Sequence, residues 1–251
     1  MLVLAVLLVV ALPLVGFVSL LLRKELDPHV ENYRLHFVVF GIAGGVAFAL
    51  GYTAGEAANR RGDARVLLLS LAFMATGGFL GLHALGTPGI LFQKEHAGFL
   101  VAIPVGLLVS AVFAGASAFI DLAPALGQRL IRRRVLLRAL VLVVMAEWLI
   151  WTVSDLPPLN GESSEAARGR LIIVLAIAGT IVYAGSAARY WRIFRQRRSL
   201  LAGAVVACFA LLAEAMIGVS ITGRTQMARE LVGMARVDPH RLPRDRPRGP
   251  S

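Results

Sequence analysis

Apolar residues occur along the chain in seven long blocks that are separated by short polar segments. The blocks cover residues 2–22, 35–55, 66–87, 98–120, 135–155, 171–191 and 200–222. Each is long enough to cross a hydrocarbon core of about 30 Å, which takes about 20 helical residues at 1.5 Å per residue. Turn formers such as Arg61-Gly62-Asp63 and Pro88-Gly89 stand where the helices should stop. The pattern predicts an all-α protein, a polytopic transmembrane helical bundle of about seven spans, over residues 1–222.

The two ends of the chain, residues 1–22 and 223–251, are interpreted separately. The first 22 residues lack a positively charged start and a small-residue cleavage site, so we expect a first span and not a removable signal peptide. Residues 223–237 are expected to form one short amphipathic helix. Residues 238–251 are rich in Pro and Arg, a composition typical of disorder.

Composition supports a membrane location and indicates which kinds of partner the protein contacts. The chain is 57% hydrophobic and only 16% charged, with a mean hydropathy of +0.73, whereas a soluble domain would spread more charge along its helices. The net charge of +11 comes from basic residues that flank the apolar blocks, where anionic lipid headgroups lie. We therefore expect a lipid bilayer as partner and no nucleic acid. The single cysteine, Cys208, excludes an internal disulfide and a CxxC metal or haem site.

Basic residues also predict the orientation, because cytoplasmic loops retain positive charge. The loops after the second, fourth and sixth blocks hold 13 of them, namely Arg60, Arg61, Arg65, Arg129, Arg132, Arg133, Arg134, Arg138, Arg189, Arg192, Arg195, Arg197 and Arg198. The other loops hold six, namely Arg23, Lys24, Arg34, Lys94, Arg168 and Arg170. This bias predicts a bacterial cytoplasmic membrane protein with its N-terminus inside. Seven spans would then place the seven further arginines from Arg224 to Arg248 outside, against the same rule.

Ionisable side chains inside the apolar blocks are the candidates for function, because each costs a few kcal/mol at membrane depth. They are His36, His83, Glu147 and Glu214, with His96 as a weaker, peripheral member at the start of the fourth block. Counting residues from the nearest block end places the first four within about 12 Å of one membrane surface, at 1.5 Å per residue. The charge bias makes that surface the outer one.

Two imidazoles and two carboxylates at one level are ligand types for Zn²⁺ or another divalent transition metal, if the helices bring them together. Haem held between His36 and His83 or His96 is a less favoured option. Neither HExxH nor HxxxH occurs, so no spacing motif supports a metal. The alternative is that Glu147 and Glu214 are protonated and hydrogen-bonded to neighbouring helices, while His36 and His96 lie in the headgroup region.

Charged residues at the opposite ends of the blocks, such as Glu56 and Asp121, are explained by headgroup contacts and local ion pairs.

Three segments resemble the N-terminal multi-span membrane region of bacterial signalling proteins that carry adenylate or guanylate cyclase, PAS, GAF or kinase output domains. The segments are GEAANRRGDAR (55–65), SLAFMATGGFLGLHALGTPGILF (70–92) and LAEAMIGVSI (212–221), and the most specific part is the Gly-Leu-His-Ala-Leu-Gly-Thr-Pro-Gly stretch around His83. The resemblance implies a sensory or regulatory membrane module. After Ile221 the chain departs from that pattern, because an Arg/Pro-rich tail replaces a further span and the output domain.

These observations lead to three hypotheses. The first is a sensory module that binds a metal ion or small ligand near its outer face through His83, Glu147, Glu214 and His36, and acts through a cytoplasmic or membrane signalling partner. The second is a metal-dependent intramembrane hydrolase that uses the same groups. The third is a small transporter, for which paired discontinuous helices would be expected. The chain has no GxSxG or P-loop motif, and neither lysine lies in the last block, which excludes a rhodopsin-type Schiff base.

Overall fold

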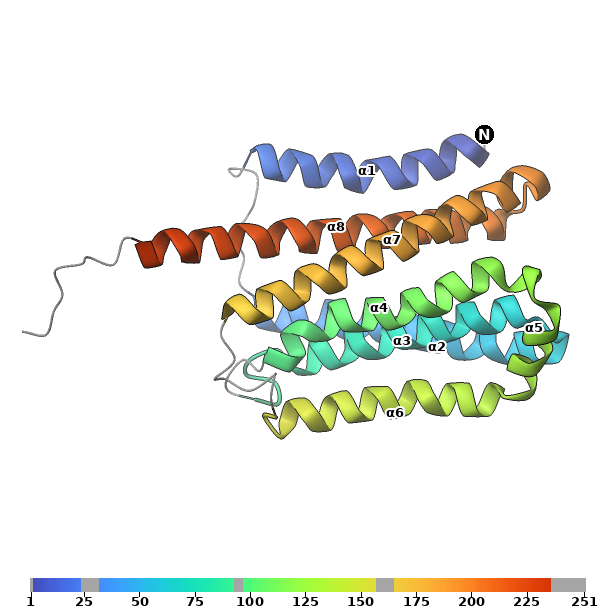
Figure 1. Ribbon diagram of the computed structural model, residues 1–251, viewed down its shortest axis with the longest axis horizontal. Helices are drawn as coiled ribbons and strands as arrows, with labels where there is room; N and C mark the ends of the chain where they lie inside the picture. The colour runs from blue at the N-terminus through green and yellow to red at the C-terminus, as the bar shows by residue number, and fades with distance from the viewer. Residues whose placement is uncertain (1, 24–31, 93–96, 157–164, 236–251) are drawn as a thin grey trace, which may run out of the picture.

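The fold was analysed in a computed structural model that describes residues 2–23, 32–92, 97–156 and 165–235. Over these ranges the chain is helical. The helices are α1 (Leu2–Leu22), α2 (Tyr33–Arg61), α3 (Ala64–Leu85), α4 (Ala97–Phe119), α5 (Pro124–Arg132), α6 (Arg134–Val153), α7 (Glu165–Arg197) and α8 (Leu200–Ala235), with a 3-10 turn η2 (Ile120–Leu122) between α4 and α5. The long axes of the longer helices run side by side, and the short α5 lies across one end (Figure 1). The predicted all-α bundle is confirmed.

Six of the described helices are long and apolar enough to cross a membrane: α2, α3, α4 continued through η2, α6, α7 and α8. The chain is thus a multi-pass membrane protein. The predicted first span is α1, which is apolar throughout. Its apolar segment, Val3–Ser19, is shorter than the apolar segments of the six spanning helices. The predicted seven spans therefore correspond to six full-length spans and this additional apolar helix.

The helices alternate in direction, so the bundle has two distinct ends. At one end lie the α2–α3 turn, helix α5 and the α7–α8 turn (Figure 1). We call this the arginine end, after Arg61, Arg65 and Arg129. At the other end lie the start of α2 and the end of α3. We call it the histidine end, after His36 and His83.

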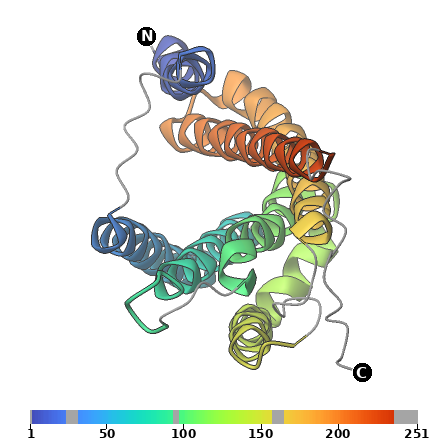
Figure 2. The same cartoon turned by 90° about the vertical axis from the view of Figure 1, so that its left-hand side faces the viewer.

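Helix α3 lies at the centre of one half of the bundle and packs against α2, α4 and α6. Seen from the histidine end, α3 and α4 occupy the middle, with α7 and α8 beyond them and α1 outermost (Figure 2). A second core joins α4, α7 and α8 around the buried Tyr183, Tyr190 and Phe209. Helix α1 runs parallel to α8, since Val6 faces Gly203 and Phe17 faces Gly218.

Glycines set the distance between α2 and α3. A Cβ atom added to Gly44 would lie 2.8 Å from the Gly77 carbonyl oxygen, and one added to Gly77 would lie 2.5 Å from the Phe48 nitrogen. The two backbones are therefore in direct contact, as small residues allow in membrane bundles. This contact fixes the register of α2 on α3, and with it the positions of the side chains at both ends.

The α2–α3 turn forms where the sequence predicts it, because its residues satisfy the helix ends. Gly62 ends α2 in the left-handed conformation, with φ of 65°. Asp63 then caps α3 by accepting hydrogen bonds from the backbone nitrogens of Arg65 and Val66. Gly89 adopts φ of 80° in the predicted Pro88-Gly89 turn.

One prediction about the connections was wrong. Helix α5 occupies part of the segment expected to be a loop, because Pro124 starts a helix at its first turn. Residues 223–235, expected to belong to a short amphipathic helix, are helical as the continuation of α8, which runs unbroken to Ala235. Gly223 costs a helix about 1 kcal/mol, which is too little to end one that has no proline in this stretch. The tail expected to be disordered, from residue 238 on, lies outside the described residues.

Candidate functional site

The two histidines at the histidine end contact each other directly. His36 lies in the first turn of α2 and His83 in the last turn of α3, and their Nε2 atoms are 3.1 Å apart. The antiparallel packing of α2 on α3 brings together residues that are 47 positions apart in the chain. Phe40, one turn after His36, contacts both imidazole rings, with ring centroids 4.5 Å and 5.1 Å away.

A backbone carbonyl decides which nitrogen of His83 carries the proton. The Nδ1 atom of His83 lies 2.9 Å from the Phe99 carbonyl oxygen, which can only accept a hydrogen bond, so Nδ1 is the donor. In the neutral ring this leaves a lone pair on Nε2, and that lone pair faces His36. The imidazole of His36 then donates its Nε2 hydrogen to His83.

The spacing and hydrogen bonding of the two imidazoles can be compared with those of histidines that bind a metal ion. Histidine ligands of metals usually donate their outer ring N–H to a carbonyl or carboxylate, as His83 does to Phe99. Two tetrahedral nitrogen ligands at 2.0–2.1 Å from one ion would be about 3.3 Å apart. The observed 3.1 Å between the Nε2 atoms is close to that spacing.

Helix α6 supports the start of α4 behind His83. The indole nitrogen of Trp148 donates a hydrogen bond of 3.0 Å to the Gly98 carbonyl oxygen, and the absence of a side chain on Gly98 leaves room for Thr152. The neighbouring Phe99 is buried and supplies the carbonyl that orients His83. Trp148 thus links α6 to the start of α4.

The other candidate residues do not join the histidine pair. Glu147 is exposed on α6, and Glu214 lies on α8 beside a cavity that faces α1. His96 lies outside the described residues. Over the described part of the chain, no three His, Cys, Asp or Glu side chains are grouped closely enough to hold a metal ion. The structure therefore retains only His36 and His83 of the expected set as neighbours.

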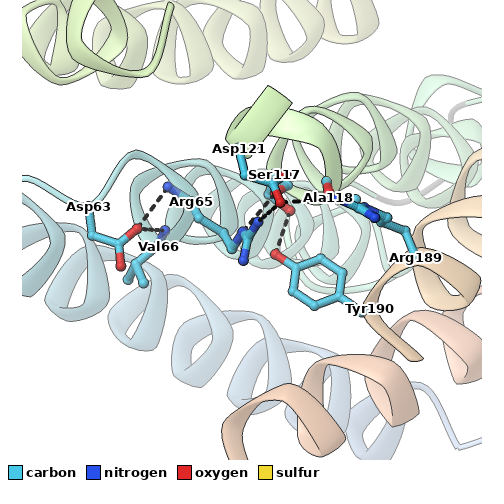
Figure 3. Close-up of polar contacts among 8 residues, drawn as sticks. All are labelled: Asp63, Arg65, Val66, Ser117, Ala118, Asp121, Arg189 and Tyr190. Carbon is cyan, nitrogen blue, oxygen red and sulfur yellow. Dashed lines mark hydrogen bonds and ion pairs between the residues drawn. The ribbon is translucent and has the colours of Figure 1, made fainter. Parts of the chain in front are cut away.

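The arginine end holds a network of charged side chains that ties three helices together. Asp121, in η2, accepts from Arg65 of α3 at 3.2 Å and from Arg189 of α7 at 3.1 Å. The same arginines donate through Nε to the carbonyls of Ser117 and Ala118 at the end of α4. Figure 3 shows both guanidinium groups converging on this carboxylate, with the hydroxyl of Tyr190 bonded to the Ser117 side chain.

A separate ion pair at this end links α2 to α6. Arg138 donates to Glu56, and its guanidinium lies 5.4 Å from the ring centroid of Tyr52. Gly55 permits this approach, since a Cβ there would lie 2.8 Å from an Arg138 nitrogen. The sequence predicted local ion pairs for Glu56 and Asp121, whereas the structure pairs both with arginines far away in the chain. The sequence prediction did not identify Arg138, which was counted as a loop residue. Its position inside the predicted span 135–155 was the available signal, because a charge there needs a partner.

Comparison with known proteins yields no match to a protein family, a curated protein or a solved structure.

Proposed function

We propose that this protein is a membrane-embedded sensory or regulatory module that binds a divalent transition metal ion at the histidine end through His36 and His83. The observation that carries the proposal is the 3.1 Å contact between the two Nε2 atoms. The hydrogen bond from the outer nitrogen of His83 to the Phe99 carbonyl supports it, because it fixes the tautomer in which Nε2 can bind a metal. The resemblance of residues 55–65, 70–92 and 212–221 to sensory membrane regions supports the same role.

The packing of α2 suggests how binding would be transmitted. Helix α2 packs chiefly on α3, and its last turns contact α6 through the Glu56–Arg138 pair at the opposite end. A metal ion would replace the single hydrogen bond between the imidazoles by two coordinate bonds, with the hydrogen of His36 carried on Nδ1, and would hold α2 and α3 together more strongly at this end. A ligand shifts a conformational equilibrium only by such a difference between states. The arginine end of α2 is then the place where a signalling partner would detect the change.

The proposed orientation places the arginine end, and with it the N-terminus, in the cytoplasm, as the positive-inside rule favours. The basic residues there would contact anionic headgroups. Helix α8 ends at the histidine end, so a C-terminal fusion should report an outer location. A reporter that is active on one side of the membrane, fused after Ser251, tests this orientation. A cytoplasmic signal would contradict it.

The metal proposal is tested by titrating the purified full chain in lipid nanodiscs with Zn²⁺, Ni²⁺ and Cu²⁺ by calorimetry. We expect saturable binding of one ion per two-histidine site, and loss of at least tenfold in affinity in both His36→Ala and His83→Ala, since each removes one of two ligands. His240→Ala is the matched control, because it removes a histidine from the tail. Equal affinity in all four proteins would rule out the site, and circular dichroism verifies that each variant is folded.

A further inference from the structure

A cavity of about 480 Å³ lies between α1 and α8, apart from the histidine pair and from the charged network. Its walls are apolar, and they include Leu14, Phe17 and Val18 of α1 with Leu211, Ile217 and Ile221 of α8. The volume falls in the range of sites that hold small molecules, which are mostly apolar with a few polar groups that fix orientation. The cavity is therefore large enough for a ligand of about the size of a substituted aromatic ring.

One carboxyl group interrupts these apolar walls. Glu214 lines the cavity, and its Oε2 atom is buried and has no hydrogen-bond partner. This finding argues against the expectation that the carboxyl group is hydrogen-bonded to a neighbouring helix. A buried carboxylate in an apolar environment needs a cation or a proton. The cavity itself has room for a cation.

The aromatic ring of Phe17 lies in the same cavity, with its edge 3.5 Å from the position that a Cβ on Gly218 would take. Aromatic faces attract cations in desolvated sites. Glu214 and Phe17 therefore favour the same kind of ligand, one that carries a positive charge. A metal ion does not fit, because Glu214 is the one carboxylate, histidine or cysteine among the described residues that line the cavity.

We infer that this cavity binds a lipophilic amine, whose ammonium group pairs with Glu214 and whose hydrocarbon or aromatic body packs against α1 and α8. A charge-assisted hydrogen bond between ammonium and carboxylate would satisfy the unpartnered oxygen. An acyl chain of a lipid would fill the apolar walls but leave that oxygen unpaired, so the carboxyl group distinguishes the two occupants. The inference does not depend on the metal site, which uses other helices.

The experiment compares two ligands of nearly equal shape, 4-phenylbutylamine and the neutral 4-phenylbutanol, on the full chain in nanodiscs. Equilibrium binding of the radiolabelled compounds is measured with empty nanodiscs subtracted. We expect saturable binding of the amine at one molecule per chain and weaker binding of the alcohol. Glu214→Gln should weaken amine binding by about tenfold or more, because it removes the charge and keeps the shape. It should leave alcohol binding unchanged.

Two further variants keep the test decisive. Glu147→Gln is the matched control, since it removes a carboxylate from an exposed position on α6 and should leave amine binding unchanged. Ala215→Phe places a large side chain in the cavity and should abolish binding of both compounds. No binding of the amine, or equal affinity of the amine for the parent and Glu214→Gln, would overturn the inference. His83→Ala should bind the amine normally, so failure of the metal site and failure of this site are distinguishable.

Discussion

The two ends of the bundle are held together in different ways. At the arginine end, one carboxylate, Asp121, pairs with arginines from two helices, and these arginines also bond to backbone carbonyls of a third. At the histidine end, the side chains of α2 and α3 share one hydrogen bond over the described residues, between the two imidazoles, beside the ring contact of Phe40 with His83. Redundant ion pairs resist small changes, whereas a single hydrogen bond between two imidazole rings responds to them. This difference agrees with the proposed division of roles, a structural one for the first end and a ligand-responsive one for the second.

The largest effect is expected from separating α2 and α3 between the two ends. In Gly77→Ala the new Cβ would lie 2.5 Å from the Phe48 nitrogen and 2.6 Å from the Gly44 carbonyl oxygen, and backbone atoms cannot rotate away. We expect a loss of about 3 kcal/mol in the free energy of unfolding, at the upper end of overpacking effects. Reversible unfolding in mixed detergent micelles, followed by circular dichroism, measures it.

Gly81→Ala is the control, because a Cβ at Gly81 meets nothing within 4 Å and lies on the same helix. It should be neutral or slightly stabilising, since alanine favours a helix over glycine by about 1 kcal/mol. Equal stability of the two variants would contradict the close contact of the backbones. Gly77→Ala should also weaken metal binding, because it displaces His36 from His83.

Removal of the shared carboxylate is the next test of the arginine end. Asp121→Asn leaves Arg65 and Arg189 without their common anion, but the Asp121 side chain is 43% exposed and solvent screens both pairs. We therefore expect a loss of only about 1 kcal/mol in unfolding free energy, which should shrink as salt is added. Asp155→Asn, at the other end, should have no effect, because Asp155 is exposed and asparagine tolerates its φ of 49°. A loss independent of salt would argue against ion pairing.

The support behind His83 can be weakened without removing either histidine. Trp148→Phe keeps an aromatic ring beside Phe79 but removes the hydrogen bond to the Gly98 carbonyl. The expected loss of unfolding free energy is about 1 kcal/mol, the net value of one hydrogen bond. Metal affinity should fall too, because the Phe99 carbonyl that orients His83 is less well held. Unchanged affinity together with unchanged stability would show that α6 does not position this site.

The smallest effect on stability is expected at the histidine pair itself. His36→Phe keeps a ring against Phe40 and removes the contact between the Nε2 atoms, so the unfolding free energy should fall by less than about 1 kcal/mol. Metal binding in the same variant should be lost. A large loss of stability would instead indicate that the histidine end is structural, and it would remove the contrast between the two ends.

Residue counting along the apolar blocks predicted how deep each ionisable side chain lies in the bundle, but not which neighbouring helix it faces. It placed His36 and His83 at one level, and the structure brings them into contact. It also placed Glu147 and Glu214 near that level, yet Glu147 is exposed on α6 and Glu214 faces the cavity beside α1. A rise of 1.5 Å per residue holds for every helix, whereas the neighbours of a helix face depend on packing with elements distant in the chain.

The sequence by itself determined the helical class, the approximate position of each long helix and the turn at Gly62 and Asp63. The reason is local: in lipid, the backbone polar groups of an apolar segment must be satisfied within the segment, which a helix achieves, and glycine and aspartate end and start helices through their own geometry. Only the tertiary structure decided which polar groups meet. The Glu56–Arg138 pair joins residues that are 82 positions apart in the chain. The histidine pair depends on the glycine contact between α2 and α3, because the angle at which two helices face each other follows from how closely their backbones can approach.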